Sequence, residues 1–131
     1  KNVMADVERG NRPLSPHLQI YRPQLTAFTS IMTRITGNGL IVTAVLIVWW
    51  FVALASGPEA YDRANGFLTS WFGDLIMTLS VAAMWYHLLA GLRHVWWDNT
   101  TRGMDIPTAY KIGYAMLAGT VVLTLLTLII V

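Results

Sequence analysis

Three long apolar runs without charged residues dominate this sequence. They lie within residues 35–55, at residues 75–92 and at residues 112–131. Each is about 18–24 residues long, enough for an α-helix to cross a hydrocarbon core of roughly 30 Å. Only 12% of the 131 residues are charged and 55% are hydrophobic, whereas a soluble domain is about 25% charged. The sequence therefore predicts a single-domain, all-α membrane protein with three transmembrane helices, at about residues 29–55, 71–97 and 108–131.

The N-terminal segment, residues 1–28, is expected to form an irregular arm on the inner side of the membrane. Pro13, Pro16 and Pro23 prevent a long helix there, because proline lacks a backbone N–H and clashes with the preceding turn. The segment has no apolar stretch of the kind found in a signal peptide. It is also too polar to enter lipid, so we expect it to lie against a soluble partner.

Polar and helix-breaking residues mark the expected ends of the helices. The hydroxyl of Thr29 or Ser30 would cap the start of the first helix, and Ser56-Gly57-Pro58 would end it. Residues 59–70 are expected to form a short amphipathic helix at the outer surface. Residues 98–107 are rich in turn-forming residues and predict a loop between the second and third spans.

Basic residues favour one side of the membrane, which predicts the orientation of the chain. The first loop carries only Arg63, offset by Glu59 and Asp62, and no charge follows the third span. The other basic residues fall before the first span, at its entrance, or around the second loop: Lys1, Arg9, Arg12, Arg22, Arg34, Arg93, Arg102 and Lys111. The N-terminus is therefore expected inside and the C-terminus outside, in a bacterial cytoplasmic membrane or a mitochondrial inner membrane.

Tryptophans agree with this orientation, because tryptophan is enriched at membrane interfaces. Trp49, Trp50 and Trp71 would lie at the outer interface, and Trp96 and Trp97 at the inner one. The net charge of +2 comes from residues that flank the spans, so it does not indicate nucleic-acid binding. The chain contains no cysteine, which excludes disulfides, thiolate metal sites and cysteine-attached haem.

The second span carries ionisable residues that point to a functional site. His87, Gly91, His94 and Asp98 follow the spacing of one helix face. His87 lies about 13 Å inside the inner interface, where an unpaired imidazole is costly and a neutral one is a good metal ligand. Gly91 leaves space for a flat macrocycle or for a close helix. Arg93 is expected to point away from this face and to reach lipid phosphates.

His87 and His94 cannot bind the same iron, because seven helical residues separate them by about 10 Å. If His87 binds a haem iron, the second axial histidine must come from another polypeptide, since His17 lies on the arm. The alternatives are a neutral His87 hydrogen-bonded to a neighbouring helix, and a His94 imidazole satisfied at the surface. As a functional residue, His94 would bind a carboxylate such as a haem propionate.

A second group of polar residues lies at the inner end of the first span. Ser30 and Arg34 are four residues apart, so they share one helix face. Their hydroxyl and guanidinium groups would hydrogen-bond the carbonyl oxygens of a buried ligand, or they would act as a helix cap and a membrane anchor. Gly37 and Gly39 permit close approach of another helix.

Two motifs in this order resemble the cytochrome b membrane-anchor subunits of succinate dehydrogenase. The first is Arg12-Pro13-Leu14-Ser15-Pro16-His17-Leu18 followed by Ser30-x-x-x-Arg34-x-Thr36. The second is His87-x-x-x-Gly91-Leu92-Arg93-His94-Val95-x-Trp97-Asp98. The three-span layout matches as well, so the resemblance covers nearly the whole chain. Thr33 stands where the family usually has histidine, and Thr100 where it usually has glycine or a small apolar residue.

The resemblance implies a subunit of a respiratory complex that passes electrons from succinate to ubiquinone. A flavoprotein subunit oxidises succinate, an iron–sulfur subunit carries the electrons, and two membrane anchors hold haem b between them. His87 would be one axial haem ligand, His94 and Arg34 would lie near the haem, and Ser30, Arg34 and Asp98 would line the quinone site. The other readings are the anchor of a fumarate reductase and a structural anchor without a cofactor.

Overall fold

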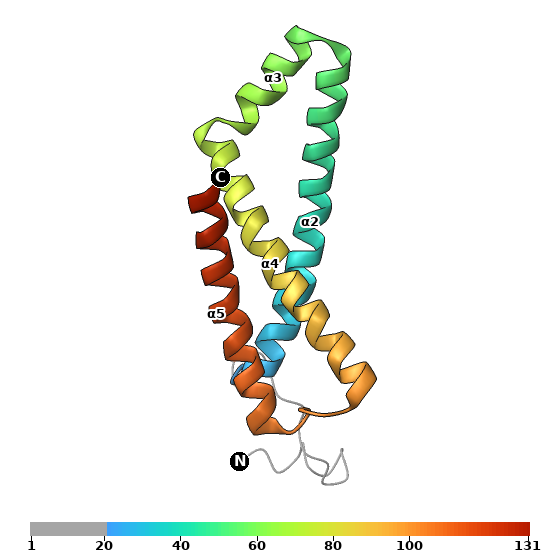
Figure 1. Ribbon diagram of the computed structural model, residues 1–131, viewed down its shortest axis with the longest axis vertical. Coiled ribbons are helices and arrows are strands. Elements are labelled where there is room, and N and C mark those ends of the chain that lie inside the picture. The colour runs from blue at the N-terminus through green and yellow to red at the C-terminus, as the bar shows by residue number, and fades with distance from the viewer. Residues whose placement is uncertain (1–20) are drawn as a thin grey trace, which may run out of the picture.

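A computed structural model describes residues 21–131 of the chain. Four α-helices follow one another: α2 (Leu25–Ser56), α3 (Pro58–Leu68), α4 (Trp71–Thr100) and α5 (Ile106–Ile130), as Figure 1 shows. The predicted all-α fold is confirmed. Most of the expected N-terminal arm, the first motif up to Leu18 and His17 lie outside the described residues.

Three of these helices are long and apolar enough to cross a membrane, namely α2, α4 and α5. Each extends a few residues beyond the predicted span. The expected cap of the first helix is wrong, because α2 begins at Leu25, after an extended Gln24 without a side-chain cap. Thr29 already lies in the second turn, and its hydroxyl donates to the carbonyl of Thr26 at 3.1 Å.

The short helix α3 joins the end of α2 to the start of α4 and lies across that end of the hairpin that they form (Figure 1). Gly57 separates it from α2 and has φ 128°, a left-handed conformation that favours glycine. The indole N–H of Trp50 on α2 donates to Asn65 Oδ1 on α3 at 3.3 Å. The same indole ring packs edge-on against Tyr61 with a centroid distance of 5.7 Å. These contacts hold α3 against α2.

A side chain caps the start of α4, and another caps the start of α5. Ser70 accepts from the amide of Gly73 at 3.2 Å at the start of α4. Asp105 accepts from the amide and the hydroxyl of Thr108 at 3.1 and 2.7 Å at the start of α5. These hydrogen bonds lower the pKa of Asp105 below its ordinary value, because they favour the charged carboxylate. The cap is therefore fully formed at neutral pH.

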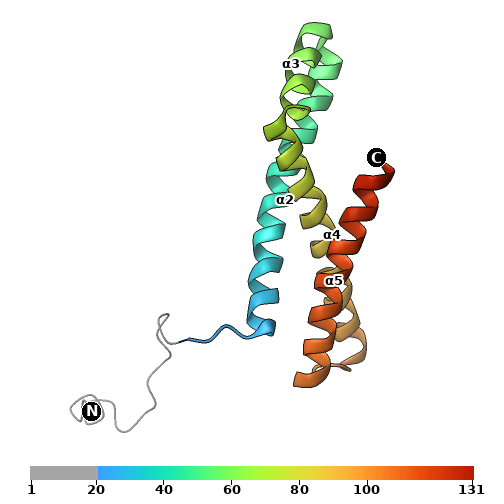
Figure 2. The same ribbon diagram turned by 90° about the vertical axis from the view of Figure 1, so that its left-hand side faces the viewer.

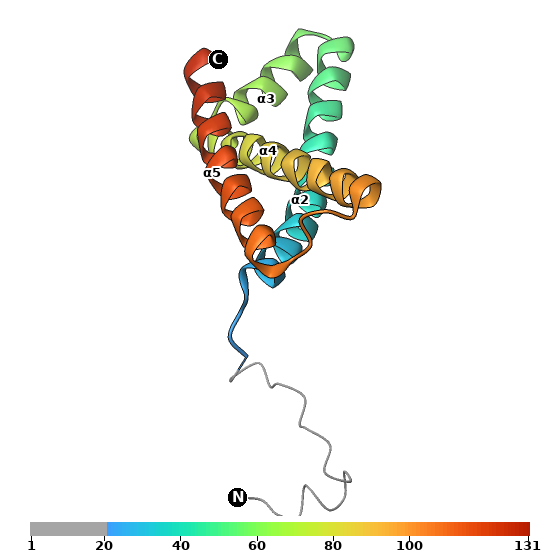
Figure 3. The ribbon, with the colours of Figure 1, turned by 60° about the horizontal axis from the view of Figure 1, so that its bottom comes forward.

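The helices pack as a crossed bundle. Helix α4 crosses α2 obliquely, and α5 runs antiparallel beside α4 (Figure 2). The view in Figure 3 shows the starts of α2 and α5 converging, where Leu25 lies within van der Waals reach of Gly113. The core between the helices is small, built around Tyr86, Ala90 and Met116. Most other large apolar side chains are exposed, which leaves wide surfaces for lipid or for other helices.

We predict that Gly73→Ala destabilises the junction between α3 and α4. An added Cβ would collide with the backbone carbonyl groups of Phe67 and Leu68, and overpacking of this kind costs about 1–3 kcal/mol. Gly66→Ala is the matched control, because its Cβ would meet nothing within 4 Å and alanine favours the helix by about 0.5–1 kcal/mol. The thermal midpoint of the purified protein should fall only for Gly73→Ala. Equal midpoints for the two variants would contradict the close packing at Gly73.

Candidate functional site

His87 lies on α4 and packs against α2 rather than pointing into lipid. Its Nδ1 is 3.2 Å from the carbonyl oxygen of Thr33 and 3.3 Å from the hydroxyl of Thr36. A carbonyl can only accept, so this contact needs the hydrogen on Nδ1, and a ring with that single hydrogen has a lone pair on Nε2. This is the arrangement in which a histidine can bind a metal through Nε2.

Two glycines provide space on either side of this histidine. A Cβ at Gly37 would lie 3.0 Å from His87 Cε1, so only glycine lets the imidazole ring approach α2 so closely. A Cβ at Gly91 would meet nothing within 4 Å among the described residues. Gly91 therefore leaves open space one turn from His87. The predicted close approach at Gly37 is confirmed, whereas Gly39 faces no neighbour within 4 Å in residues 21–131.

A polar pocket of about 400 Å³ lies between α2 and α4, near the start of α2 and the end of α4. Its walls are Thr26, Thr29, Ser30, Thr33 and Arg34 of α2 and Arg93, His94 and Trp97 of α4. Two arginines line this polar pocket, and among residues 21–131 no aspartate or glutamate does. The pocket thus offers hydrogen-bond donors and positive charge to a ligand with acceptor oxygens.

The structure brings together three of the residues that the sequence singled out, since Ser30, Arg34 and His94 share this pocket. Thr33 connects the pocket to His87, because it lines the pocket and its carbonyl accepts from the imidazole. Asp98 is exposed near the end of α4 and is not among the pocket residues.

Arg93 does not extend toward lipid phosphates, and that prediction is wrong. Its side chain is 8% exposed, and Nη1 donates to the hydroxyl of Thr29 at 3.3 Å. The guanidinium lies over the Trp97 ring, 4.8 Å from the centroid, a distance at which a cation–π interaction is favourable. Packing against α2 and Trp97 therefore holds Arg93 inside the protein.

The residues that sequence reasoning missed lie on a second stripe of α4. Tyr86, Ala90, Arg93 and Trp97 repeat at spacings of four, three and four, which is the pattern of one helix face. Tyr86 is 3% exposed and Ala90 is fully buried. This spacing was the available signal that Arg93 faces the protein interior.

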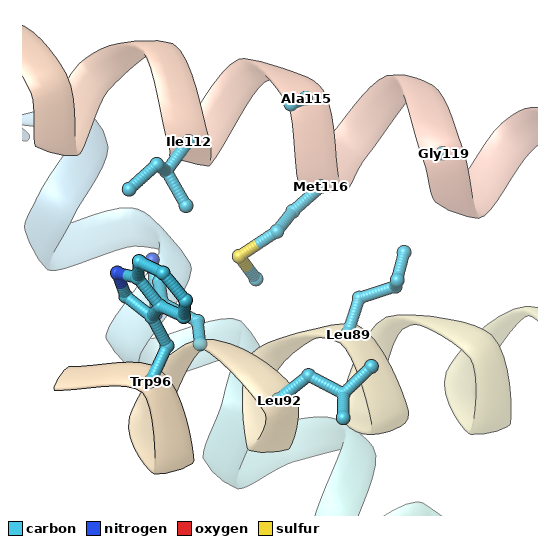
Figure 4. A pocket seen from close by; sticks show the side chains of 8 residues that line it. Leu89, Leu92, Trp96, Ile112, Ala115, Met116 and Gly119 are labelled. Atoms are coloured by element: carbon cyan, nitrogen blue, oxygen red, sulfur yellow. The ribbon is translucent and has the colours of Figure 1, made fainter. Parts of the chain in front are cut away.

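An apolar groove of about 410 Å³ lies on the other side of Arg93, between α4 and α5. Figure 4 shows Met116 of α5 at its centre, facing Leu89, Leu92 and Trp96 of α4. Arg93 lines both this groove and the polar pocket. It therefore forms the wall between a charged cavity and an apolar surface.

Three candidate membrane spans, with a polar pocket between two of them, define a small multi-pass membrane protein. The sequence model of the family described as "Succinate dehydrogenase/Fumarate reductase transmembrane subunit" matches residues 8–127. The succinate dehydrogenase cytochrome b556 subunit of Paracoccus denitrificans is 56% identical over 97% of both chains. The cytochrome b560 subunit of Reclinomonas americana is 38% identical over 92% of this chain and 86% of its own.

A further relative is the succinate dehydrogenase cytochrome b556 subunit of Rickettsia conorii, which is 35% identical over 88% of this chain and 89% of its own. The chain belongs to the succinate dehydrogenase/fumarate reductase transmembrane subunit family, as a cytochrome b type membrane anchor of succinate dehydrogenase. The resemblance stated from the two sequence motifs is thereby confirmed.

We expect Tyr86→Phe to loosen the crossing of α2 and α4. The Tyr86 hydroxyl donates to the Thr29 carbonyl at 2.7 Å, and loss of one buried hydrogen bond costs about 0.5–1.5 kcal/mol. The same carbonyl also accepts from the Thr33 hydroxyl, so it keeps a partner and the loss stays within this range. The measurement is the thermal midpoint of the purified complex, which should fall.

Tyr114→Phe is the matched control for this hydroxyl deletion. Tyr114 is 60% exposed, and no hydrogen bond of its hydroxyl occurs within residues 21–131. Its removal should leave the midpoint unchanged. If both variants lower the midpoint equally, the Tyr86–Thr29 bond does not stabilise the crossing.

Proposed function

We propose that this membrane anchor holds one axial position of a haem b through His87. The observation that supports the proposal is the hydrogen bond from Nδ1 to the Thr33 carbonyl at 3.2 Å, which leaves the Nε2 lone pair for iron. The open space at Gly91 can admit a planar macrocycle beside the helix. The relatives are cytochrome b556 and b560 subunits, names that agree with this cofactor. When bound, the haem supplies one-electron redox chemistry.

A second histidine for the haem would have to come from another polypeptide. Of the three histidines in the chain, His94 is about 10 Å from His87 along the helix axis and His17 lies before the first span. The wide exposed apolar surfaces of α2, α4 and α5 also need covering by lipid or by further helices. A second membrane anchor would supply both the ligand and the helices.

The polar pocket is the proposed site of ubiquinone reduction. Ser30 and Arg34 place a hydroxyl and a guanidinium in its wall, and both can donate to a quinone carbonyl oxygen. The pocket lies at the inner end of the spans, the side on which an iron–sulfur subunit would dock if the N-terminus is inside. Asp98 stays outside the pocket in this chain, so a role for it would require the partner subunits.

The complete complex would then carry electrons from succinate through flavoprotein and iron–sulfur subunits to the quinone. The relatives are named as subunits of succinate dehydrogenases, which favours succinate oxidation over fumarate reduction. The chain itself positions the cofactor and the quinone, and the oxidation of succinate takes place on another subunit.

Replacement of His87 by Leu is expected to abolish the low-spin, bis-histidine haem spectrum of the purified complex. Leucine offers no lone pair to the iron, and no other histidine of the chain lies at the same depth. The measurement is the reduced-minus-oxidised absorption spectrum. His94→Gln is the matched control and should keep low-spin haem, because His94 lies about 10 Å further along α4. An unchanged spectrum in the His87 variant would disprove the assignment.

Ser30→Ala and Arg34→Lys should each lower quinone reductase activity. Loss of a donor to a buried carbonyl costs about 1–3 kcal/mol, or roughly 5- to 150-fold in binding. Lysine keeps the charge of arginine but lacks its planar, bidentate geometry. Steady-state rates with ubiquinone should fall, whereas succinate oxidation with an artificial acceptor upstream of the quinone should remain normal.

The matched controls are Ser56→Ala, at the outer end of α2, and Arg102→Lys, in the second loop. Both residues are exposed and lie outside the polar pocket, so their quinone kinetics should equal those of the unmodified complex. Normal kinetics in the Ser30 and Arg34 variants would remove these two residues from the site. If instead Arg34 only anchors the helix to lipid phosphates, Arg34→Lys will be silent.

A further inference from the structure

Asn38 of α2 is an exposed polar residue inside a candidate membrane span. Leu25 and Ser56, the two ends of α2, lie about 20 Å and about 27 Å from Asn38 along the helix axis. A hydrocarbon core is roughly 30 Å thick. Wherever a core of this thickness falls along α2, it includes Asn38. The side-chain amide is therefore placed at a depth where lipid is apolar and water is scarce.

The side chain of Asn38 points away from the other helices of the chain. Thr36 is 7% exposed, and its hydroxyl contacts His87 of α4. Successive residues of an α-helix are turned by about 100°, so Asn38 lies about 200° around α2 from Thr36. Ile41 and Val45 lie on the same side as Asn38, and each is 63% exposed. This side of α2 thus faces either lipid or another polypeptide.

Only part of the Asn38 amide is satisfied within residues 21–131. Nδ2 donates to the Arg34 carbonyl at 3.1 Å, and this is the one hydrogen bond of the side chain in that part of the molecule. Oδ1 and the second N–H remain, and hydrocarbon offers neither a donor nor an acceptor. Asn99 makes the same bond to the Val95 carbonyl at 2.8 Å, but it lies in the last turn of α4, where water can supply the missing partners.

The residues next to Asn38 on this side of α2 indicate what covers it. Arg34 and Ser30 precede Asn38 by one and two helical turns, and both line the polar pocket. A helix that closes the pocket over these two residues reaches Asn38 one turn further on. A second copy of this chain fits this side poorly. Two copies in one membrane share one orientation, so a twofold interface would place Arg34 opposite Arg34 in a medium of low dielectric.

We infer that Asn38 hydrogen-bonds a hydroxyl or amide side chain on a transmembrane helix of the second membrane anchor. The inference rests on the proposed function, which introduces that anchor. A hydroxyl or an amide both donates and accepts, so one such group serves Oδ1 and the second N–H together. Polar side chains join membrane helices in this way. Asn38 thereby connects the two anchors within the bilayer, one turn beyond the polar pocket.

The first test identifies the neighbour of Asn38 in the intact, membrane-embedded complex. Asn38 is replaced by the photoreactive residue p-benzoylphenylalanine, the membranes are irradiated, and the products are identified by mass spectrometry. The expected product joins this chain to the second anchor. A product with lipid alone, with a second copy of this chain or with another subunit overturns the inference. So does the absence of any product with a polypeptide.

The second test measures how much of the second anchor leaves the purified complex during a detergent titration. Asn38→Leu leaves the partner's polar group unpaired and should raise the dissociation constant of the second anchor roughly 3- to 20-fold. Asn38→Gln keeps an amide and should have a smaller effect. Contact with lipid predicts the opposite sign, because hydrocarbon accepts leucine more readily than asparagine. Unchanged or tighter association in Asn38→Leu therefore rules out the hydrogen bond.

Asn99→Leu is the matched control for the detergent titration. Asn99 is also exposed and is also bonded to the carbonyl four residues before it. It lies at the end of α4, so its replacement should leave the dissociation constant unchanged. A rise of the same size in both leucine variants would be a general effect of removing an asparagine and would contradict the inference.

Failure of the proposed function gives a different result. If the purified, unmodified complex contains no second membrane polypeptide or shows no Soret band, the proposed function fails before any variant is compared. If the unmodified complex has both, and the Asn38 variants give neither the cross-link nor the weaker association, the proposed function stands and the inference on Asn38 alone is lost.

Discussion

The cost of an unpaired polar group in hydrocarbon is the constraint on which this structure depends. Each such group costs several kcal/mol, so polar side chains within the spans pair across helices. The hydroxyls of Thr43 on α2 and Ser80 on α4 are 2.7 Å apart, and the indole of Trp85 on α4 donates to Thr127 on α5 at 2.9 Å. His87 follows the same rule through the Thr33 carbonyl. The helices are joined by a few hydrogen bonds around a small apolar core.

The spans could be predicted from the sequence because hydropathy and length alone determine which helices can cross a bilayer. The surface helix α3 could also be predicted, since Gly57-Pro58 interrupts the first helix and polar residues follow. The start of α2 could not be predicted from the sequence. Its first turn lacks a side-chain cap, so no residue type marks it, and the first few amides of the helix need no partner other than water.

The candidate site was predictable where it follows one helix face and unpredictable where it depends on how two helices cross. The spacing of His87, Gly91 and His94 predicted one shared face of α4, and the structure places His94 in the wall of the polar pocket opposite Ser30 and Arg34. Arg93 was misread because an arginine near a membrane interface ordinarily extends to phosphates. Only the packing of α4 on α2 shows that Thr29 and Trp97 hold it inside.

The two stripes of α4 face different surroundings. One packs inside this chain, and the other is open to a neighbour. The stripe of Tyr86, Ala90 and Arg93 is buried against this chain's own helices. The stripe of Gly91 and His94 is exposed, although a histidine and a bare glycine backbone gain nothing from contact with lipid. His87 lies where the first stripe meets the second, bonded to α2 through one ring nitrogen. The other nitrogen is the one that the proposed haem would use.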